Sequence, residues 1–472
     1  MKATFLGGGS LRLLPILRGV FMQAPDVFRN GEIRLADRKT ERAQAVGALL
    51  AACPEYRNVG CKICWTDNLD EALDGIDVLY LTMGARREPT ETLSKYAAQE
   101  YGYFSSDQLS VNGAFLSLRL GGFILELARK MEKHCPDALM LIFPNPVSVY
   151  SCLVNTYTKI QALGICGGYN NHRFDLSRLC GRNEFDPDWN VVAAGVNHLS
   201  FILRGDYRGE DLYESLLPRV LNSSWHGSDC VLTGNPHEAF FQSNLKKVLD
   251  NLYVLYRKYR TLVFSTEADG MAHIFTEDAL ECQRKYLQIH YADFDPEKAR
   301  MEERRQEEER FAQFIRMSRT PEKVNWELPW RENLLYGADH TDITIPILKA
   351  AAGIEKMRIV ASRPNGGVIA GLPDRAAVEY TMDIYKKTIT PLENQYIPSP
   401  FQGLIASLSE FQTLQAEAIA KHDPQIFAAA LEAYPVHRFQ PERKAFFRRM
   451  FEIYTDLDPV MRRAGDLLLC GS

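Results

Sequence analysis

The 472 residues of the chain are enough for two lobes, and a composition of 46% hydrophobic and 24% charged residues with a net charge of −5 is that of an ordinary globular protein. Because the charge is weak and no block of Lys and Arg stands out, we expect no nucleic-acid partner. No apolar run reaches membrane-spanning length and no secretory leader pattern is evident, so we expect a cytoplasmic protein that binds a small molecule and no membrane.

The first elements in chain order form a strand, turn and helix unit. Residues 2–9 are a predicted strand that runs into the glycine turn of FLGGGSLRLLP, and residues 11–22 are apolar at helical spacing. A second strand is predicted over residues 32–38. This order is typical of the start of a nucleotide-binding sheet.

The glycine turn deviates from the dinucleotide fingerprint GxGxxG. Gly7 and Gly9 match its first two glycines, but its third position falls on Arg12. Asp37, near the end of the second strand, stands where an acidic residue accepts the hydroxyls of an adenosine ribose. We therefore expect Gly7, Gly9, Ser10 and Asp37 to bind the cofactor.

Helices and strands alternate through the rest of the first lobe. Helices are predicted over residues 40–53, 68–75, 115–135 and 147–160, and strands over 61–65, 76–84, 138–146 and 162–168. Alternation of this kind implies a parallel sheet covered on both faces. We expect an α/β fold whose residues 1–190 form a doubly wound, Rossmann-type nucleotide-binding domain; the alternative is a sheet of this type without a nucleotide.

Ten cysteines are spread over the chain, which predicts reduced, structural thiols and not a disulfide framework. Cys61 and Cys64, in CKIC, have metal or redox spacing but no second pair at finger spacing, so we expect no function for them.

The pattern changes after about residue 190. Residues 191–205 form a long apolar segment interrupted by polar residues. Residues 296–324 are predicted to form a charged, solvent-exposed helix. Residues 411–436 are predicted to form helices that cover the C-terminal part of the protein. We expect residues 191–472 to form a second, α+β lobe that binds substrate and metal. Because no linker is evident, the two lobes should share an interface.

Polar residues follow three of the predicted strands. They are Asn145 in FPNPVS, Cys166 in GICGG, and Asn197 with His198 in GVNHLSF. Ligands of open parallel sheets bind outside the carboxyl ends of the strands, so these side chains are candidates for one site. A thiolate and an imidazole would suit a divalent transition metal with open positions for substrate. For Asn145 alone, capping of the following helix is an equal alternative.

Several motifs together resemble the NAD-dependent family-four glycoside hydrolases, which include alpha-glucosidases, alpha-galactosidases and 6-phospho-glucosidases. In order, they are GGGS followed by a proline, the Asn-Pro dipeptide at Asn145, the cysteine after LGI, and GVNHLSF. RPNGGVIAGLPDRAAVEY, from Arg363 to Tyr380, resembles the family's C-terminal pattern. The resemblance runs from residue 5 to about residue 380 and implies a fold similar to lactate and malate dehydrogenases. In this family the turn is GGGS, so Arg12 is no defect, and the N–H groups of the turn should face the pyrophosphate.

The chemistry implied by the resemblance is redox-assisted elimination, an exception among glycosidases. Hydride passes from the sugar C3 to NAD+, a base removes the C2 proton, the aglycone leaves from C1, water adds, and the hydride returns. Cys166 and His198 would hold a divalent metal such as Mn2+, although sulfur is an unusual ligand for manganese, so the metal stays open. Asn145 and Asn197 would orient sugar hydroxyls. Arg87 and its neighbour Arg86, in GARREP, would approach the substrate. The alternative is that these two arginines lie in a solvent-exposed loop without a function.

The base is not fixed by the resemblance. Some members use a tyrosine, to which Tyr253 and Tyr256 in NLYVLY are similar, and others an aspartate, to which Asp269 in TEADGMAH, followed by His273, is similar. We prefer Tyr256, with a place in the core as its alternative; a tyrosine base needs its pKa lowered by a cation. His340 and Asp342 are further candidates for the cleft.

The clearest departure from the family follows the cysteine, where many members have an aspartate, histidine or asparagine that assists the leaving group or reads the substrate, and this sequence has Gly167, Gly168 and Tyr169. The departure is consistent with an unusual sugar, a good leaving group or a lost activity. Any acid must then come from elsewhere, and Asn170, Asn171 and His172 are candidates. No basic cluster specifies a sugar 6-phosphate, so we expect an unphosphorylated glycoside as the partner.

Two rival functions remain open. A plain NAD-dependent hydroxy-acid or sugar dehydrogenase would share the fold and would accumulate NADH. A silent sugar- or nucleotide-binding homologue would bind cofactor without exchanging the C2 proton. The family resemblance also suggests a homodimer or homotetramer.

Overall fold

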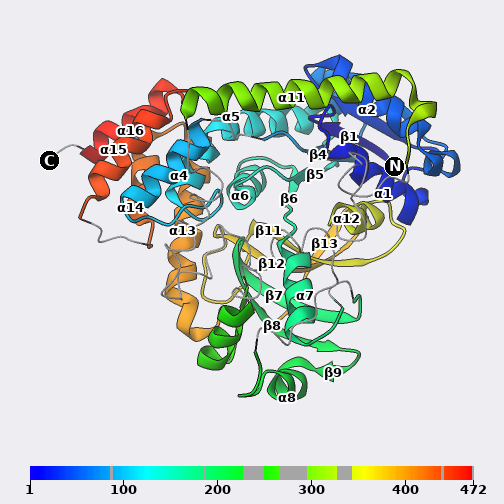
Figure 1. The fold of residues 1–472 in the computed structure, drawn as a ribbon. Coiled ribbons are helices and arrows are strands. Elements are labelled where there is room, and N and C mark those ends of the chain that lie inside the picture. The colour runs from blue at the N-terminus through cyan, green and yellow to red at the C-terminus, as the bar shows by residue number, and fades with distance from the viewer. Residues whose placement is uncertain are drawn as a thin grey trace.

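The computed structural model describes residues 1–84, 89–183, 186–226, 249–264, 295–326, 343–436 and 441–469. Within them, 13 strands form one sheet in the order β10-β8-β7-β12-β11-β6-β5-β4-β1-β2-β3, with β13 beside β12 and β9 beside β8. In Figure 1, β1, β4, β5 and β6 lie in the upper part of the view, and β7, β8, β11, β12 and β13 lie below them. The strands are β1 (Lys2–Leu6), β2 (Glu32–Ala36), β3 (Lys62–Thr66), β4 (Val78–Leu81), β5 (Leu139–Ile142), β6 (Gln161–Gly164), β7 (Trp189–Val196), β8 (Leu199–Tyr207), β9 (Glu210–Asp211), β10 (Leu262–Phe264), β11 (Met357–Pro364), β12 (Ala377–Tyr385) and β13 (Thr388–Pro391).

The first six strands confirm the doubly wound fold. They pair in parallel in the order β3-β2-β1-β4-β5-β6. The chain order reverses between β1 and β4, and in such sheets ligands bind outside the carboxyl ends of the strands at this point. The glycine turn follows β1 and therefore lies at that point.

Helices cover both faces of this parallel part. The helices of the described residues are α1 (Leu13–Gln23), α2 (Thr40–Ala52), α3 (Leu69–Leu73), α4 (Thr90–Glu100), α5 (Val111–His134), α6 (Val147–Tyr157), α7 (Gly168–Leu179), α8 (Leu217–Val220), α11 (Pro296–Arg319), α12 (Thr344–Ala351), α13 (Gln402–Lys421), α14 (Pro424–Ala433), α15 (Arg443–Ile453) and α16 (Pro459–Leu469). All four residues of β4 are buried. Val78 and Tyr80 belong to the cluster that includes α1, α2 and the first turns of α5, whereas Leu79 and Leu81 belong to the cluster that includes the later turns of α5. A strand buried on both faces reads as a continuous apolar run, which is why IDVLYL predicts a central strand.

The second half of the chain extends the same sheet with antiparallel strands. β11 joins β6 through the pair Ser362 and Gly164, and β12, β7 and β8 follow. The apolar segment over residues 191–205 is a tight hairpin, because β7 and β8 pair directly up to Val196 and Leu199. Its two polar residues, Asn197 and His198, form the turn.

The helices of the second half contact those of the first, as the lack of a linker predicts. α13 packs on both α5 and α6. The predicted solvated helix is α11, whose one fully buried side chain among the described residues is Phe314. Arg305 pairs with Glu302 and Glu309 on its surface. The proposed division at residue 190 stays a prediction, since the sheet is continuous across it.

One helix of the described residues, α5, is long and apolar enough to cross a membrane by length and composition. Of its most apolar stretch, 67% is buried inside the protein, as in a core helix. The described cysteines are free, as predicted. Burial raises the pKa of the Cys61 thiol to about 11, so this half of the CKIC pair is a poor nucleophile.

Candidate active site

One row of paired residues crosses the sheet close to the predicted site residues. The row runs through Leu81, Ile142, Gly164, Ser362, Glu379, Gly195 and Ser200. Asn145 and Cys166 lie three and two residues beyond this row on β5 and β6, and the hairpin turn with His198 lies just beyond it on β7. β5 and β6 are parallel neighbours and end at the same edge, which accounts for Asn145 and Cys166. β7 runs in the opposite direction to β6, so strand direction does not bring its turn to this edge. The contact between Cys166 and His198 shows that the turn lies there.

Cys166 and His198 meet as the sequence predicts. The Cys166 Sγ atom lies 3.7 Å from the His198 Nε2 atom, and both residues are partly exposed. Two ligands at roughly 2.3 and 2.1 Å from one ion, at a tetrahedral angle, lie about 3.5 Å apart. The pair therefore fits two cis ligands of one metal ion.

The backbone of His198 is held in an uncommon conformation. Its φ is 70°, in the left-handed region that favours glycine. A histidine there costs free energy that the two-residue turn and the packed strands beside it must offset. This conformation aims the imidazole at Cys166.

The neighbouring Asn197 is fixed by an acid that sequence reasoning missed. Its Nδ2 atom donates to the Oε2 atom of Glu379 at 2.6 Å, and the two residues are 1% and 3% exposed. The Oδ1 atom of Asn197 is buried without a hydrogen-bond partner among the described residues. A buried acceptor of this kind needs a partner, which a ligand at the site would provide.

Asn145 does not cap the helix that follows it. The N-cap position of α6 is Pro146, and no side-chain hydrogen bond caps this helix. Instead the Asn145 amide lies between Asp107 and Gln108, at 2.8 and 2.6 Å. The structure therefore excludes the capping alternative for Asn145, and its role in substrate binding stays a prediction.

The glycine turn packs against the end of β2. Gly7 has a φ of 89°, and a Cβ on Gly9 would lie 2.5 Å from the Cβ of Arg42. The Gly9 N–H donates to the Oδ2 atom of Asp37 at 2.9 Å. The predicted cofactor residues are thus adjacent, and the acidic residue also holds the turn.

The expectation that the N–H groups of the turn face a pyrophosphate is not met in this conformation. The N–H groups of Gly7 and Gly8 both donate to the Ala36 carbonyl, and that of Ser10 donates to the Gly7 carbonyl. These donors are used in fastening the turn to β2 and to itself. The Arg12 guanidinium lies 3.8 Å from the centre of the Phe143 ring, which joins the start of α1 to the end of β5.

His172 is not a suitable general acid. It is 5% exposed, and burial, together with the nearby His198, lowers its pKa to about 3. Its ring lies 3.4 Å from the Ser200 hydroxyl. A neutral imidazole at pH 7 holds no extra proton to donate.

The structure does not support Tyr256 as the base. Tyr256 is 2% exposed and belongs to the apolar cluster that contains Leu179 and Cys180, at the C-terminal end of α7. Cys166 precedes the other end of this 12-residue helix, which is about 18 Å long. Burial raises the pKa of Tyr256, the opposite of what a base needs. The Tyr253 hydroxyl donates to the Asn222 carbonyl at 2.6 Å.

Other predicted residues lie outside the described residues. They are Arg86, Arg87, Asp269, His273, His340 and Asp342. The side chains of Asn170 and Asn171 are likewise not described. Gly167 is described: its φ is −65°, and a Cβ built on it would meet no described atom within 4 Å.

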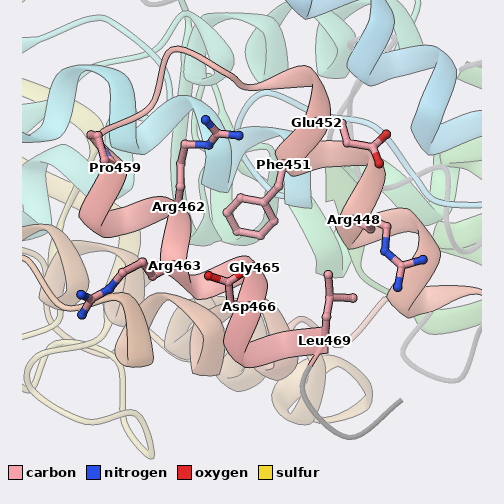
Figure 2. A pocket seen from close by; sticks show the side chains of 9 residues that line it. All are labelled: Arg448, Phe451, Glu452, Pro459, Arg462, Arg463, Gly465, Asp466 and Leu469. Carbon is pink, nitrogen blue, oxygen red and sulfur yellow. The ribbon is translucent and has the colours of Figure 1, made fainter.

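A separate groove lies between α15 and α16 (Figure 2). It encloses about 350 Å³ and is lined by Arg448, Phe451, Glu452, Pro459, Arg462, Arg463, Gly465, Asp466 and Leu469. None of the candidate site residues lines it. Its charged side chains carry both signs, and we assign it no chemistry.

Family models match most of the chain. Residues 2–179 match the model described as family 4 glycosyl hydrolase, and residues 193–436 match the family 4 glycosyl hydrolase C-terminal domain. The chain is 23% identical to an alpha-galacturonidase of Thermoanaerobacter italicus and 22% identical to a probable 6-phospho-beta-glucosidase of Bacillus subtilis, with 96% of both chains covered in each case.

Solved structures share the fold. A 6-phospho-alpha-glucosidase from gut microorganisms, in complex with NAD and Mn2+, has a TM-score of 0.74 at 19% identity over 96% of this chain and 98% of its own. A 6-phospho-beta glucosidase from Thermotoga maritima, with manganese, NAD+ and glucose-6-phosphate, has a TM-score of 0.71 at 17% identity over 97% and 99%.

Proposed function

The chain belongs to family 4 of the glycosyl hydrolases and is a glycoside hydrolase; from this premise we propose that it cleaves O-glycosidic bonds by NAD- and metal-dependent oxidation and elimination. The observation that carries the proposal is the approach of Cys166 to His198 at 3.7 Å, beside Asn145 at the carboxyl ends of the strands. A dehydrogenase of the hydroxy-acid type would have no use for a thiolate in this place.

The described residues supply part of what each group needs: two ligands for a metal ion, with no third His, Cys, Asp or Glu beside them among the described residues, and an acid for a ribose beside a turn whose Gly7 and Gly8 N–H groups bond to Ala36. The sulfur and nitrogen donors suit a divalent transition metal, and their partial exposure leaves positions for substrate oxygens. Asp37 at the end of β2, beside the glycine turn, suits an adenosine ribose. When bound, NAD supplies a hydride acceptor that later returns the hydride, and the metal supplies an electrophile for sugar oxygens.

The chain's own residues then bind and orient the sugar. Asn145 and Asn197 offer amide groups at the edge where the metal ligands stand. Asp269 stays our candidate for the base that removes the C2 proton, because Tyr256 is buried elsewhere. Arg87 stays a candidate substrate residue.

Gly167 narrows the substrate class. A glycine cannot protonate a departing oxygen, and the His172 imidazole is neutral and buried. We therefore propose a glycoside whose aglycone leaves without strong acid assistance, such as an aryl or otherwise acidic leaving group. Because no basic cluster for a 6-phosphate stands out in the sequence, we also propose that the sugar is unphosphorylated. A small glycoside as partner, a cytoplasmic location and a homodimer or homotetramer complete the proposal.

The test is a panel of 4-nitrophenyl glycosides of glucose, galactose and galacturonic acid, in both anomers, with NAD+ and Mn2+ under reducing conditions. Aglycone release and NADH absorbance are read together. We expect release that requires both cofactors while NADH stays at a trace level. Steady NADH accumulation would indicate a dehydrogenase, and silence in both channels would indicate a binding protein.

The matched variant is Cys166→Ser. It should lose metal-dependent turnover, because a serine hydroxyl is a far weaker ligand than a thiolate, while NAD binding survives. Cys180→Ser, which lies at the far end of α7, is the control and should keep turnover. Unchanged turnover of Cys166→Ser in metal-free buffer would refute the site.

A further inference from the structure

Residues 106–110, just before α5, form a hydrogen-bonded segment that we call the platform and that lies beside Asn145. The Ser106 hydroxyl accepts from the N–H groups of Gln108 and Leu109 at 3.1 and 3.2 Å. The Ser110 hydroxyl accepts from the Ser106 N–H at 2.8 Å and donates to the Ser106 carbonyl at 2.6 Å. Gln412, on α13, donates to the Gln108 carbonyl at 3.2 Å. The platform is therefore tied to itself and to the C-terminal half.

This platform delivers two buried side chains to Asn145. Asp107 is 7% exposed and Gln108 is fully buried, whereas Asn145 is partly exposed. The Asn145 Nδ2 atom donates to the Asp107 Oδ2 atom at 2.8 Å, and the Gln108 Nε2 atom donates to the Asn145 Oδ1 atom at 2.6 Å. An ionised carboxylate only accepts, so the NH2 side of Asn145 must face Asp107.

We propose that Asp107 is a positioning residue, which fixes the Asn145 amide so that it offers an N–H donor to the substrate. The proposal rests on the proposed function, in which Asn145 contacts a sugar hydroxyl. Among the described contacts, one N–H of the Asn145 amide is used by Asp107, which leaves the other for a ligand. Without Asp107, the Asn145 amide could turn over together with the Gln108 amide, whose Oε1 atom has no hydrogen-bond partner among the described residues, and would then exchange its donor and acceptor sides.

The fixed orientation matters for a sugar oxygen that changes its bonding during a reaction. An N–H donor can bond to a hydroxyl oxygen and equally to a carbonyl oxygen that replaces it. An amide oxygen in the same place could accept only from the hydroxyl and would face the carbonyl oxygen unfavourably. Asp107 therefore selects the amide orientation that suits both states.

The test is a double-mutant cycle on the full-length protein with NAD+ and Mn2+. Its variants are Asp107→Leu, Asn145→Ala and the double variant, with Asp107→Asn as the conservative rescue that keeps an acceptor. We expect Asp107→Leu to lower kcat/KM about 30-fold, mostly through kcat. In the Asn145→Ala background it should cause less than a twofold further loss, because an effect transmitted through Asn145 cannot be lost twice. Asp107→Asn should recover at least part of the activity.

Equal losses in both backgrounds would overturn the proposal, since Asp107 would then act independently of Asn145. The proposal would also be overturned if Asp107→Leu and Asp107→Asn lost the same amount of activity and the same amount of melting temperature, because this would indicate a structural role. If the wild type releases no aglycone, the same cycle is read as the affinity for free galacturonate and glucose in calorimetry. Coupled losses of sugar affinity would support the positioning role of Asp107 even though the proposed function fails. If no sugar binds at all, both the positioning role and the proposed function are rejected.

Discussion

The Asn197 side chain donates a 2.6 Å hydrogen bond to the buried carboxylate of Glu379, which ties the hairpin turn that carries His198 to the first part of β12. Glu379 pairs with Gly195 across the sheet, two residues before Asn197. The acid therefore supports the backbone that holds His198 in its left-handed conformation.

Replacing Glu379 by leucine should loosen this turn. Loss of one partner leaves a buried polar group unsatisfied, which costs about 1–3 kcal/mol. We expect Glu379→Leu to lower the free energy of unfolding by about that amount and to weaken Mn2+ binding, measured by urea unfolding and by calorimetry. Glu379→Gln, which keeps an acceptor for the Asn197 amide, is the matched control and should lose less in both. Equal behaviour of the two variants would argue against this role.

Tyr256→Phe should leave turnover almost unchanged. The hydroxyl belongs to a buried residue at the far end of α7 from Cys166, and burial raises its pKa. We expect kcat and its pH profile to stay within about twofold of the wild type, since a base contributes 10²–10⁴-fold and its loss would be unmistakable. A hundredfold fall in kcat with an intact melting temperature would restore Tyr256 as the base.

The sequence predicts the strands and the polar residues at their ends well, but it predicts poorly which side chains contact one another at those ends. Continuous apolar runs predict the central strands, and the polar residues after them, such as Asn145 and Cys166, could be found because ligands gather at carboxyl ends. Glu379 could not be found in this way. It lies 182 residues from Asn197, and only the register of β12 against β7 brings the two together.

Tyr256 shows a second limit of sequence patterns. Tyrosines at helical spacing read alike whether they fill a core or enter a cleft, and only burial separates the two. The glycine turn shows a third limit of sequence patterns. Its glycines predict a place for a cofactor, yet the pattern could not predict that the Gly7 and Gly8 N–H groups bond to Ala36.

Asp383 should make stability depend on pH in the acid range. Burial raises its pKa, but the hydrogen bonds donated by Arg358 and Lys356 outweigh burial and bring the pKa below its ordinary value of 3.8. A lowered pKa means that the stabilisation is complete above the unfolded value and is lost as the pH falls through the folded one.

Because both cations are more than a third exposed, we expect Asp383→Asn to cost about 1 kcal/mol or less at pH 7. The difference from the wild type should shrink below about pH 4, as the pH falls through the lowered pKa of Asp383. Urea unfolding at several pH values checks this. A difference that is constant from pH 7 to pH 3 would show that packing, and not charge, is responsible.

Gly167→Asp should add an acid without a cost in stability. The backbone there is right-handed helical, which any residue adopts, and a Cβ would meet open space among the described atoms. A carboxyl group before the first turn of α7 also interacts favourably with the helix N-terminus. We expect an unchanged or slightly higher melting temperature.

On activity, the new carboxyl group should matter only where the leaving group needs a proton. We expect methyl glycosides to be cleaved at least tenfold faster by Gly167→Asp, and 4-nitrophenyl glycosides to change less than threefold, since general acids contribute most to poor leaving groups. Gly167→Asn, which has the same shape but no proton to give, is the control. If both variants accelerate methyl glycosides equally, the gain comes from substrate binding and the glycine does not limit proton transfer.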